Sequence, residues 1–193
     1  CSGEHQGRRR YLSQGFDSAI TVPFCPESEL SGVGYKDFIP AMWYHRSITI
    51  PAAWAGQRVM LNFGAVDYEC EAYIDGASVG VHFGGSSSFS FDITGRVSPG
   101  GCHHLVLRIA DDPRSRHQPG GKQSHSFESS GCHYTRTTGI WQTVWMEAVA
   151  PAGLRDAQII GDVDGRRFIV NPRYWRELRG ARLQVMLKAA GET

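Results

Sequence analysis

The chain has 193 residues, 20 basic and 19 acidic side chains, and a formal net charge of +1. Because the two signs are interspersed, no extended field of one sign attracts nucleic acid or an anionic membrane surface, and we expect neither as a partner. The length suffices for one domain with some residues to spare, since a domain of roughly 150 residues buries about 70% of the surface that its unfolded chain exposes.

The first residues, which include Arg8-Arg9-Arg10, lack the apolar core of a signal peptide. No apolar run along the chain approaches the roughly 20 residues that cross a bilayer. We therefore favour a cytoplasmic protein, with a lipoprotein or a secreted protein as the alternative if Cys1 is a processed terminus.

Short β-strands are predicted through the middle of the chain. Residues 59–63 and 69–74 place apolar side chains at every second position, the period of a half-buried strand, and Asp75-Gly76 then supplies a tight hairpin turn. The same alternation returns at 89–93 and 105–109, and no stretch of similar length has helical spacing. This pattern predicts an all-β fold in which two sheets bury their inner faces against each other, as a sandwich or jelly roll.

Residues 111–138 interrupt the strand pattern. This segment is rich in Gly, Ser, His, Arg and Lys, and it is too long for a routine hairpin. Long loops in compact domains are usually functional or disordered. We expect an ordered or ligand-ordered loop at one end of the sandwich, with a floppy insertion as the alternative.

The tryptophans are candidates for the core or for stacking on sugar rings. Trp141 and Trp145 are four residues apart, so on one strand they would face the same side. We expect these two and Trp43 to pack in the core, and Trp54 to lie at the surface.

Alternating apolar residues resume after Pro151 and continue towards Thr193. Residues 151–193 are too few to close a second core unaided, because chains of about 40 to 60 residues are marginal. We predict a complete domain over residues 1–150 and a truncated second domain over residues 151–193.

Four motifs in this order carry a resemblance to a known family: Pro23-Phe24-Cys25-Pro26-Glu27-Ser28, Val66-Asp67-Tyr68, His82-Phe83-Gly84-Gly85, and the run from Gly139 to Glu147. Together they resemble the N-terminal sugar-binding domain of glycoside hydrolase family 2. The resemblance implies a jelly roll over residues 1–150, followed by the start of an immunoglobulin-like sandwich over residues 151–193. It also implies that the chain is part of a retaining β-galactosidase-like enzyme whose catalytic TIM barrel lies outside this sequence.

The resemblance also indicates substrate-binding residues. In β-galactosidases of this family an aspartate directly after the strand that resembles residues 107–110 binds sugar hydroxyls, and Asp111 occupies that place. We include Asp112 beside it. Arg136 matches an arginine of the family motif and could pair with Asp111 or Asp112 to hold the loop.

No catalytic residue, metal or cofactor is expected in the chain itself. The sequence has no alternating strand and helix units from which a barrel could be built, and the pair Glu69 and Glu71 has the alternation of a solvated strand face. The five cysteines form no Cys-x-x-Cys pair, which argues against a disulfide framework or a zinc site.

The implied partners are a β-linked glycoside substrate and the catalytic barrel of the parent enzyme, and a homo-oligomer is allowed. The alternative function is a stand-alone noncatalytic carbohydrate-binding or adhesion module. A third reading is a structural sandwich that binds no sugar.

Overall fold

The computed structural model describes residues 16, 18–115, 117–176, 180 and 182–188. The chain divides into two compact units, Cys1–Val149 and Ala150–Thr193. Cys1 and Arg8-Arg9-Arg10, on which the expectations about targeting rest, lie outside the described residues. Within the described part of the chain, no helix is long and apolar enough to cross a membrane.

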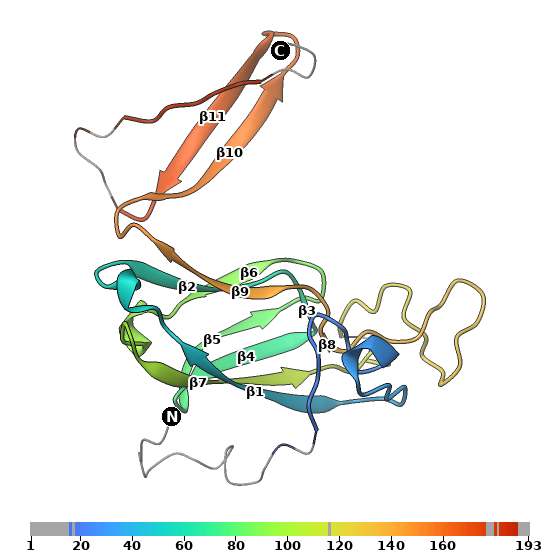
Figure 1. The fold of residues 1–193 in the computed structure, drawn as a ribbon. Helices are drawn as coiled ribbons and strands as arrows, with labels where there is room; N and C mark the ends of the chain where they lie inside the picture. The colour runs from blue at the N-terminus through green and yellow to red at the C-terminus, as the bar shows by residue number, and fades with distance from the viewer. Residues whose placement is uncertain (1–15, 17, 116, 177–179, 181, 189–193) are drawn as a thin grey trace. The chain divides into compact units, whose positions relative to one another are not determined.

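The first unit consists of antiparallel sheets (Figure 1). The larger sheet has the strand order β1 (Ala41–Thr49), β7 (Cys102–Ala110), β4 (Glu69–Ile74), β5 (Ala77–Phe83). The smaller has the order β6 (Phe89–Asp92), β2 (Arg58–Phe63), β9 (Val144–Val149), and a short pair joins β3 (Val66–Asp67) to β8 (Gly139–Ile140). Three short 3-10 turns accompany them in the described residues: η1 (Glu29–Ser31), η2 (Ala52–Trp54) and η3 (Thr94–Arg96).

The core lies between the two larger sheets and follows the predicted alternation. In β2 the buried residues that join the core are Val59, Leu61 and Phe63, and the Phe63 ring stacks on Phe89 of β6 with centroids 4.7 Å apart. β4 buries every second side chain against the same core. The predicted all-β fold is therefore confirmed, because both inner faces are apolar at the period that a pleated strand requires.

The predicted hairpin turn joins β4 to β5. Ile74 pairs with Ala77, so the loop consists of Asp75 and Gly76, and both have positive φ angles, 49° and 81°. Two successive residues with positive φ match the twist of the flanking strands. The Asp75 carboxylate also accepts a 2.8 Å hydrogen bond from the backbone N–H of His104, which ties the turn to β7.

The tryptophans depart from the expectation. Trp145 is 43% exposed and Trp43 is 38% exposed. Trp145 lies between Val144 and Met146, which face the core, so the strand alternation directs its ring to the opposite side. Trp54, expected at the surface, is partly buried and packs against the core. The prediction of core packing is thus wrong for Trp43 and Trp145, and Trp141 precedes β9 instead of lying on the same strand as Trp145.

The cysteines also depart in part from expectation. Cys25, Cys70 and Cys132 are free thiols. Cys102, however, forms a disulfide bond, which the sequence did not lead us to expect.

The second unit is an antiparallel hairpin of β10 (Leu154–Asp162) and β11 (Arg167–Tyr174). Its large apolar side chains are exposed, among them Ile159, Val163 and Phe168, and the same holds for Leu183 and Leu187 further along. Two strands bury little apolar surface between them, and an isolated hairpin is marginally stable at best. The assignment of this unit to an immunoglobulin-like domain stays a prediction.

Candidate functional site

Three buried carboxylates lie at the end of the first unit where η1, β3 and β8 come together (Figure 1). Glu27 precedes η1, Asp67 is the last residue of β3, and Asp111 directly follows β7; their exposed fractions are 4%, 7% and 2%. Asp111 continues the inward-facing alternation of Leu107 and Ile109, which explains its burial. We call Glu27, Asp67 and Asp111 the carboxylate cluster.

Asp111 is held by two hydrogen bonds. The side-chain amide Nε2 of Gln118 donates to Asp111 Oδ1 at 2.6 Å, and the hydroxyl of Thr138 donates to Oδ2 at 3.2 Å. Asp112, the next residue along, is exposed, and its Oδ1 accepts a 3.1 Å hydrogen bond from the backbone N–H of Arg114. The structure therefore places Asp111 inside the cluster and Asp112 in a surface turn.

Asp67 and Glu27 have donors from the same side of the cluster. Gln123 Nε2 donates to Asp67 Oδ2 at 2.7 Å, and Gln123 Oε1 accepts from the backbone N–H of Thr137 at 2.8 Å. Both Glu27 oxygens accept from the backbone N–H of Thr138, at 3.1 and 3.2 Å. Adjacent backbone positions just before β8 thus connect all three carboxylates into one network.

Burial dominates the electrostatics of the cluster. It raises the pKa of Asp67 to about 6, the charge of Asp111 adds to this rise, and the hydrogen bond from Gln123 opposes it. The pKa of Asp111 is also raised by burial, against the lowering effect of the hydrogen bonds from Gln118 and Thr138. A carboxylate that is costly to ionise gains most from additional hydroxyl donors, because charge-assisted hydrogen bonds are the stronger ones.

Arg136 does not form the expected ion pair. Its side chain is 2% exposed, and in the described part of the chain it donates to carbonyl oxygens and not to Asp111 or Asp112. The acceptors are the carbonyls of Lys36, Ser124, Ser126 and Phe127, with the Ser126 bond at 2.6 Å. The pairing prediction is therefore wrong, because three carbonyls of the 111–138 loop and the carbonyl of Lys36 surround the guanidinium.

Phe38 adds a second anchor for the 111–138 loop. The guanidinium carbon of Arg136 lies 4.2 Å from the centroid of the Phe38 ring, and that of Arg114 lies 4.0 Å from it. Cations over an aromatic face are attracted by its quadrupole. The loop is thus fastened to the segment that precedes β1.

Sequence reasoning missed most of the network around Asp111. Glu27 and Asp67 lie inside motifs that supported the family resemblance, but nothing in those motifs indicated a shared site. Gln118 and Thr138 carry no signal, because polar residues in a polar loop are unremarkable. Within the described residues, no group of three His, Cys, Asp or Glu side chains is placed to hold a metal ion.

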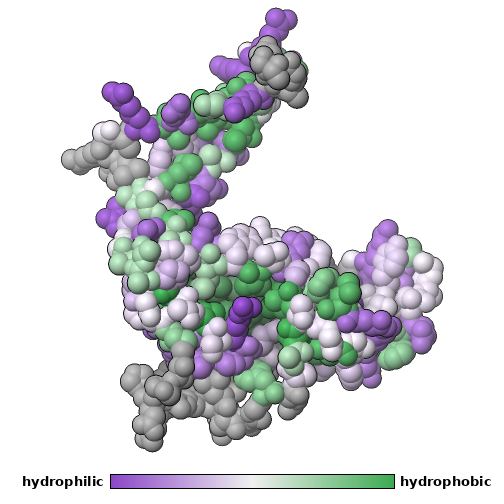
Figure 2. Space-filling view, viewed as in Figure 1, coloured by the Kyte–Doolittle hydropathy of each residue, from purple (hydrophilic) through white to green (hydrophobic). Residues whose placement is uncertain are grey.

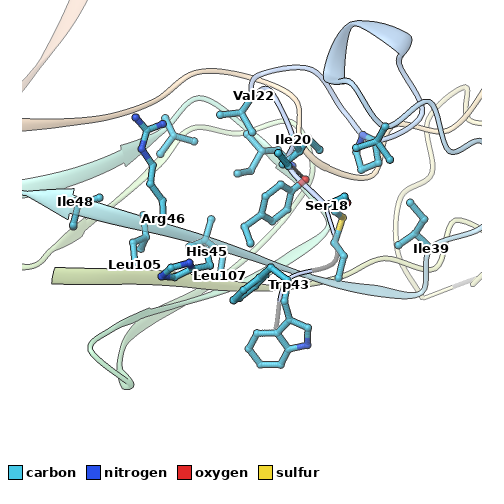
Figure 3. Close-up of a pocket in the computed structure, with 18 of the residues that line it drawn as sticks. Ser18, Ile20, Val22, Ile39, Trp43, His45, Arg46, Ile48, Leu105 and Leu107 are labelled. Atoms are coloured by element: carbon cyan, nitrogen blue, oxygen red, sulfur yellow. Dashed lines mark hydrogen bonds between the residues drawn. The ribbon is translucent and has the colours of Figure 1, made fainter. Parts of the chain in front are cut away.

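A cavity of about 900 Å³ lies elsewhere in the first unit, beside β1 and the segment that precedes it (Figure 3). Figure 2 shows hydrophobic residues gathered in a hollow of this unit. The lining of the 900 Å³ cavity is largely apolar and includes Ile20, Val22, Ile48, Leu105 and Leu107. A sugar needs several converging polar groups, so the carboxylate cluster is the better candidate site.

Comparisons with known proteins agree with this architecture. The family described as glycosyl hydrolases family 2, sugar binding domain, matches residues 13–146. A β-galactosidase from Bacteroides ovatus is 30% identical over 145 residues, which cover 74% of this chain and 15% of that protein. A β-glucuronidase from Paenibacillus borealis is 24% identical over 165 residues, which cover 78% of this chain and 27% of that protein.

A solved structure shares the fold. The β-glucuronidase of Faecalibacterium prausnitzii superposes with a TM-score of 0.59 at 22% identity, over 79% of this chain and 30% of that one. The chain therefore spans less than a third of the length of the relatives that it matches.

Proposed function

This chain belongs to glycoside hydrolase family 2 through its sugar-binding domain, and on that premise we propose that it is the N-terminal part of a retaining glycosidase that hydrolyses β-linked glycosides. Its role in that enzyme is to lend Asp111 to the sugar subsite of a catalytic barrel. The observation that carries the proposal is the place of Asp111, at the end of β7 and inside a polar network on the domain that the family match covers.

A carboxylate suits this role because it accepts hydrogen bonds from two neighbouring sugar hydroxyls. Gln118 and Thr138 already occupy both Asp111 oxygens. In the proposed complex a sugar hydroxyl takes the place of the Gln118 amide on Asp111 Oδ1. Thr138, next to β8, stays in place and orients the carboxylate.

Exposed apolar side chains near the cluster support the proposal that a catalytic domain packs against this surface. Leu30 in η1 is 69% exposed, Tyr35 is 52% exposed, and Tyr134 and Phe127 in the 111–138 loop are 63% and 54% exposed. Soluble proteins rarely leave large apolar surface uncovered unless a partner packs there. The hairpin β10–β11 also exposes apolar residues, and this chain covers only a small part of its relatives. Both observations support the proposal that the second unit is part of a larger domain.

Catalysis would come from the barrel. Retaining glycosidases use two carboxyl groups about 5 Å apart, one as the nucleophile and one as the acid and base. Glu69, one of the two glutamates on the outer face of β4, is paired with Arg108 at 3.1 Å, which suits a surface ion pair and not a nucleophile. The 193-residue chain alone is expected to be inactive.

The test uses the complete gene product and the 193-residue chain side by side. With aryl β-galactosides and β-glucuronides, the full protein should turn over at least one substrate, the short chain none, and Asp111→Asn should lower kcat/KM of the full protein by about 100-fold or more. Turnover by the short chain would contradict the proposal, as would an Asp111→Asn enzyme with unchanged kcat/KM.

A stand-alone carbohydrate-binding module is the second candidate. The observation in its favour is Trp43 on the outer face of the larger sheet, where its ring lies 6.3 Å from that of Tyr73. Calorimetry of the 193-residue chain with galactose, glucuronate and mannose separates the two, because only an independent module should bind a monosaccharide without the barrel. A homo-oligomer stays a prediction for either case.

A further inference from the structure

The three carboxylates of the cluster differ in whether both of their oxygens accept a hydrogen bond. Asp111 has a donor on each oxygen, and Glu27 accepts from the Thr138 N–H with both. Asp67 has the Gln123 amide on Oδ2, while its Oδ1 is buried and has no hydrogen-bond partner among the described residues. The negative charge is therefore least stabilised on Asp67.

Gly85 explains why no donor reaches Oδ1 of Asp67 from that side. A Cβ atom built on Gly85 would lie only 2.3 Å from this oxygen, so the carboxyl group is packed directly against the glycine backbone. The Gly85 carbonyl is in turn fixed by a 2.8 Å hydrogen bond from Nε1 of Trp141. Asp67 Oδ1 is thus packed against the Gly85 backbone and accepts no hydrogen bond from the described residues.

The charged groups around the cluster do not offset three negative charges. The Arg136 guanidinium is directed to backbone carbonyls, Arg114 lies over the Phe38 ring, and Lys122 is exposed. Of the acidic neighbours, Asp112 adds further negative charge near Asp111.

The remaining titratable neighbours are two neutral side chains, Cys25 and Tyr44. Cys25 precedes Glu27, and Tyr44 of β1 accepts a 3.3 Å hydrogen bond from the Ile140 N–H. Burial raises the pKa of both side chains. Neither compensates the cluster, and burying several uncompensated carboxylates is costly, so one of them is expected to hold a proton.

We propose that Asp67 is a positioning residue that holds this proton, so that Asp111 keeps the negative charge with which it receives sugar hydroxyls. The purpose of the arrangement rests on the proposed function, whereas the location of the proton does not. A neutral Asp67 removes the electrostatic repulsion between the two carboxylates. Below the pH at which Asp67 ionises, Asp67 is neutral and Asp111 carries the negative charge.

The titration behaviour supports this division. The pKa of Asp67 is raised to about 6, with burial as the main cause and the charge of Asp111 next. Burial has the largest effect on the pKa of Asp111 and raises it. The hydrogen bonds from Gln118 and Thr138 have the next largest effects and lower it. Because the two groups interact, the proton leaves in a step that belongs to the pair, and the assignment to Asp67 is what the experiment must decide.

The decisive measurement is a carbon-13 NMR titration of the side-chain carboxyl groups in the 193-residue chain from pH 3 to 8. The Asp67 carbon should show the larger change, with a midpoint near 6, and the Asp111 carbon should titrate at a lower pH. The wild-type chain suffices for this assignment, so a variant that fails to fold does not weaken the test. A midpoint near 6 on the Asp111 carbon, with Asp67 titrating lower, would overturn the proposal.

Two isosteric variants sharpen the result. Asp67→Asn should abolish the titration step near pH 6 and move the Asp111 midpoint down, because the neighbouring charge is gone. Asp111→Asn should keep a step on Asp67 and move it down for the same reason. If the step near pH 6 survives Asp67→Asn and disappears in Asp111→Asn, the proton belongs to Asp111 and the proposal fails.

The full-length enzyme gives a readout that a merely structural role would not move. The pH profile of kcat/KM should lose an inflection near pH 6 in Asp67→Asn, with the change in KM and not in kcat. A profile identical to that of the wild type would contradict the positioning role. If the full-length protein has no glycosidase activity, the proposed function fails, whereas the NMR titration still decides where the proton resides.

Discussion

Nε2 of Gln118 donates a 2.6 Å hydrogen bond to Oδ1 of Asp111, the residue that ends the inward-facing row of β7. The same glutamine accepts from the backbone N–H of Asp112 at 3.3 Å. One side chain of the 111–138 loop therefore satisfies both the carboxylate and the backbone at the point where the loop leaves the sheet.

Replacing Gln118 with alanine should destabilise the chain by about 1–3 kcal/mol, because a buried carboxylate loses its shortest hydrogen bond. It should also raise the pKa of Asp111 further, since the hydrogen bond from Gln118 stabilises the charged form. Urea unfolding and the NMR titration measure the two effects. The exposed Gln57 gives the matched control, and Gln57→Ala should change stability by less than about 0.5 kcal/mol. Equal effects at both glutamines would show that the 118 contact contributes nothing.

Asp67→Asn should change the pH dependence of stability. The folded-state pKa of Asp67 is raised to about 6, so its contribution to stability is fully present below the unfolded value of 3.8 and is lost as the pH rises through about 6. Asparagine does not ionise, so at pH 7.5 the variant should be more stable than the wild type. The shift corresponds to at most about 3 kcal/mol, at about 1.4 kcal/mol per pKa unit.

The difference between the Asp67→Asn variant and the wild type should shrink towards pH 4. Urea unfolding curves at pH 4 and pH 7.5 provide the measurement. The reverse order, with the variant relatively more stable at pH 4, would mean that the raised pKa of Asp67 is wrong.

Arg136→Met should loosen the 111–138 loop. The substitution leaves buried carbonyls without their donor and should cost about 2–4 kcal/mol. Limited proteolysis should then cut within residues 111–138 at a lower protease concentration than in the wild type. Arg114→Met is the matched control, because Arg114 also lies over Phe38 but is exposed, and its loss should cost less than about 1 kcal/mol. A loop that resists protease equally in Arg136→Met and in the wild type would refute this anchoring.

Gly85→Ala should disturb Asp67 directly. The new Cβ would lie 2.3 Å from Asp67 Oδ1, so the carboxyl group or the backbone at residue 85 must move, at a cost of about 1–3 kcal/mol. Gly95→Ala is the control, since a Cβ there meets nothing within 4 Å. Thermal unfolding measures both. A Gly85→Ala variant as stable as Gly95→Ala would show that the site has room that the structure does not indicate.

Several elements could be predicted because their signal is local. The strand at 69–74 alternates in burial in step with the pleat, the strand at 59–63 directs Val59, Leu61 and Phe63 into the core, and Asp75-Gly76 is the residue pair that a two-residue hairpin favours. The prediction for Trp145 failed although its pattern is equally local. The spacing to Trp141 was read as one strand, whereas β9 begins only at Val144 and its alternation places Trp145 outside.

The partners of Arg136 could not be predicted from spacing. Lys36, whose carbonyl accepts from the guanidinium, is 100 residues away in the chain, and Thr138, which donates to Glu27, is 111 residues away from it. Such contacts exist only after the sheets have brought distant loops to one end of the sandwich. The family motifs indicated that these segments matter, but not that they meet.

The order of polar and apolar residues along the chain was enough to determine an all-β fold and the place of several of its strands, because the alternation within a strand is a local property of the sequence. The composition of the carboxylate cluster, the unpartnered oxygen of Asp67 and the carbonyl cage of Arg136 were decided by the tertiary structure alone. Their energies depend on distance, burial and competing donors between residues far apart in sequence, and none of these quantities is defined before the chain has folded.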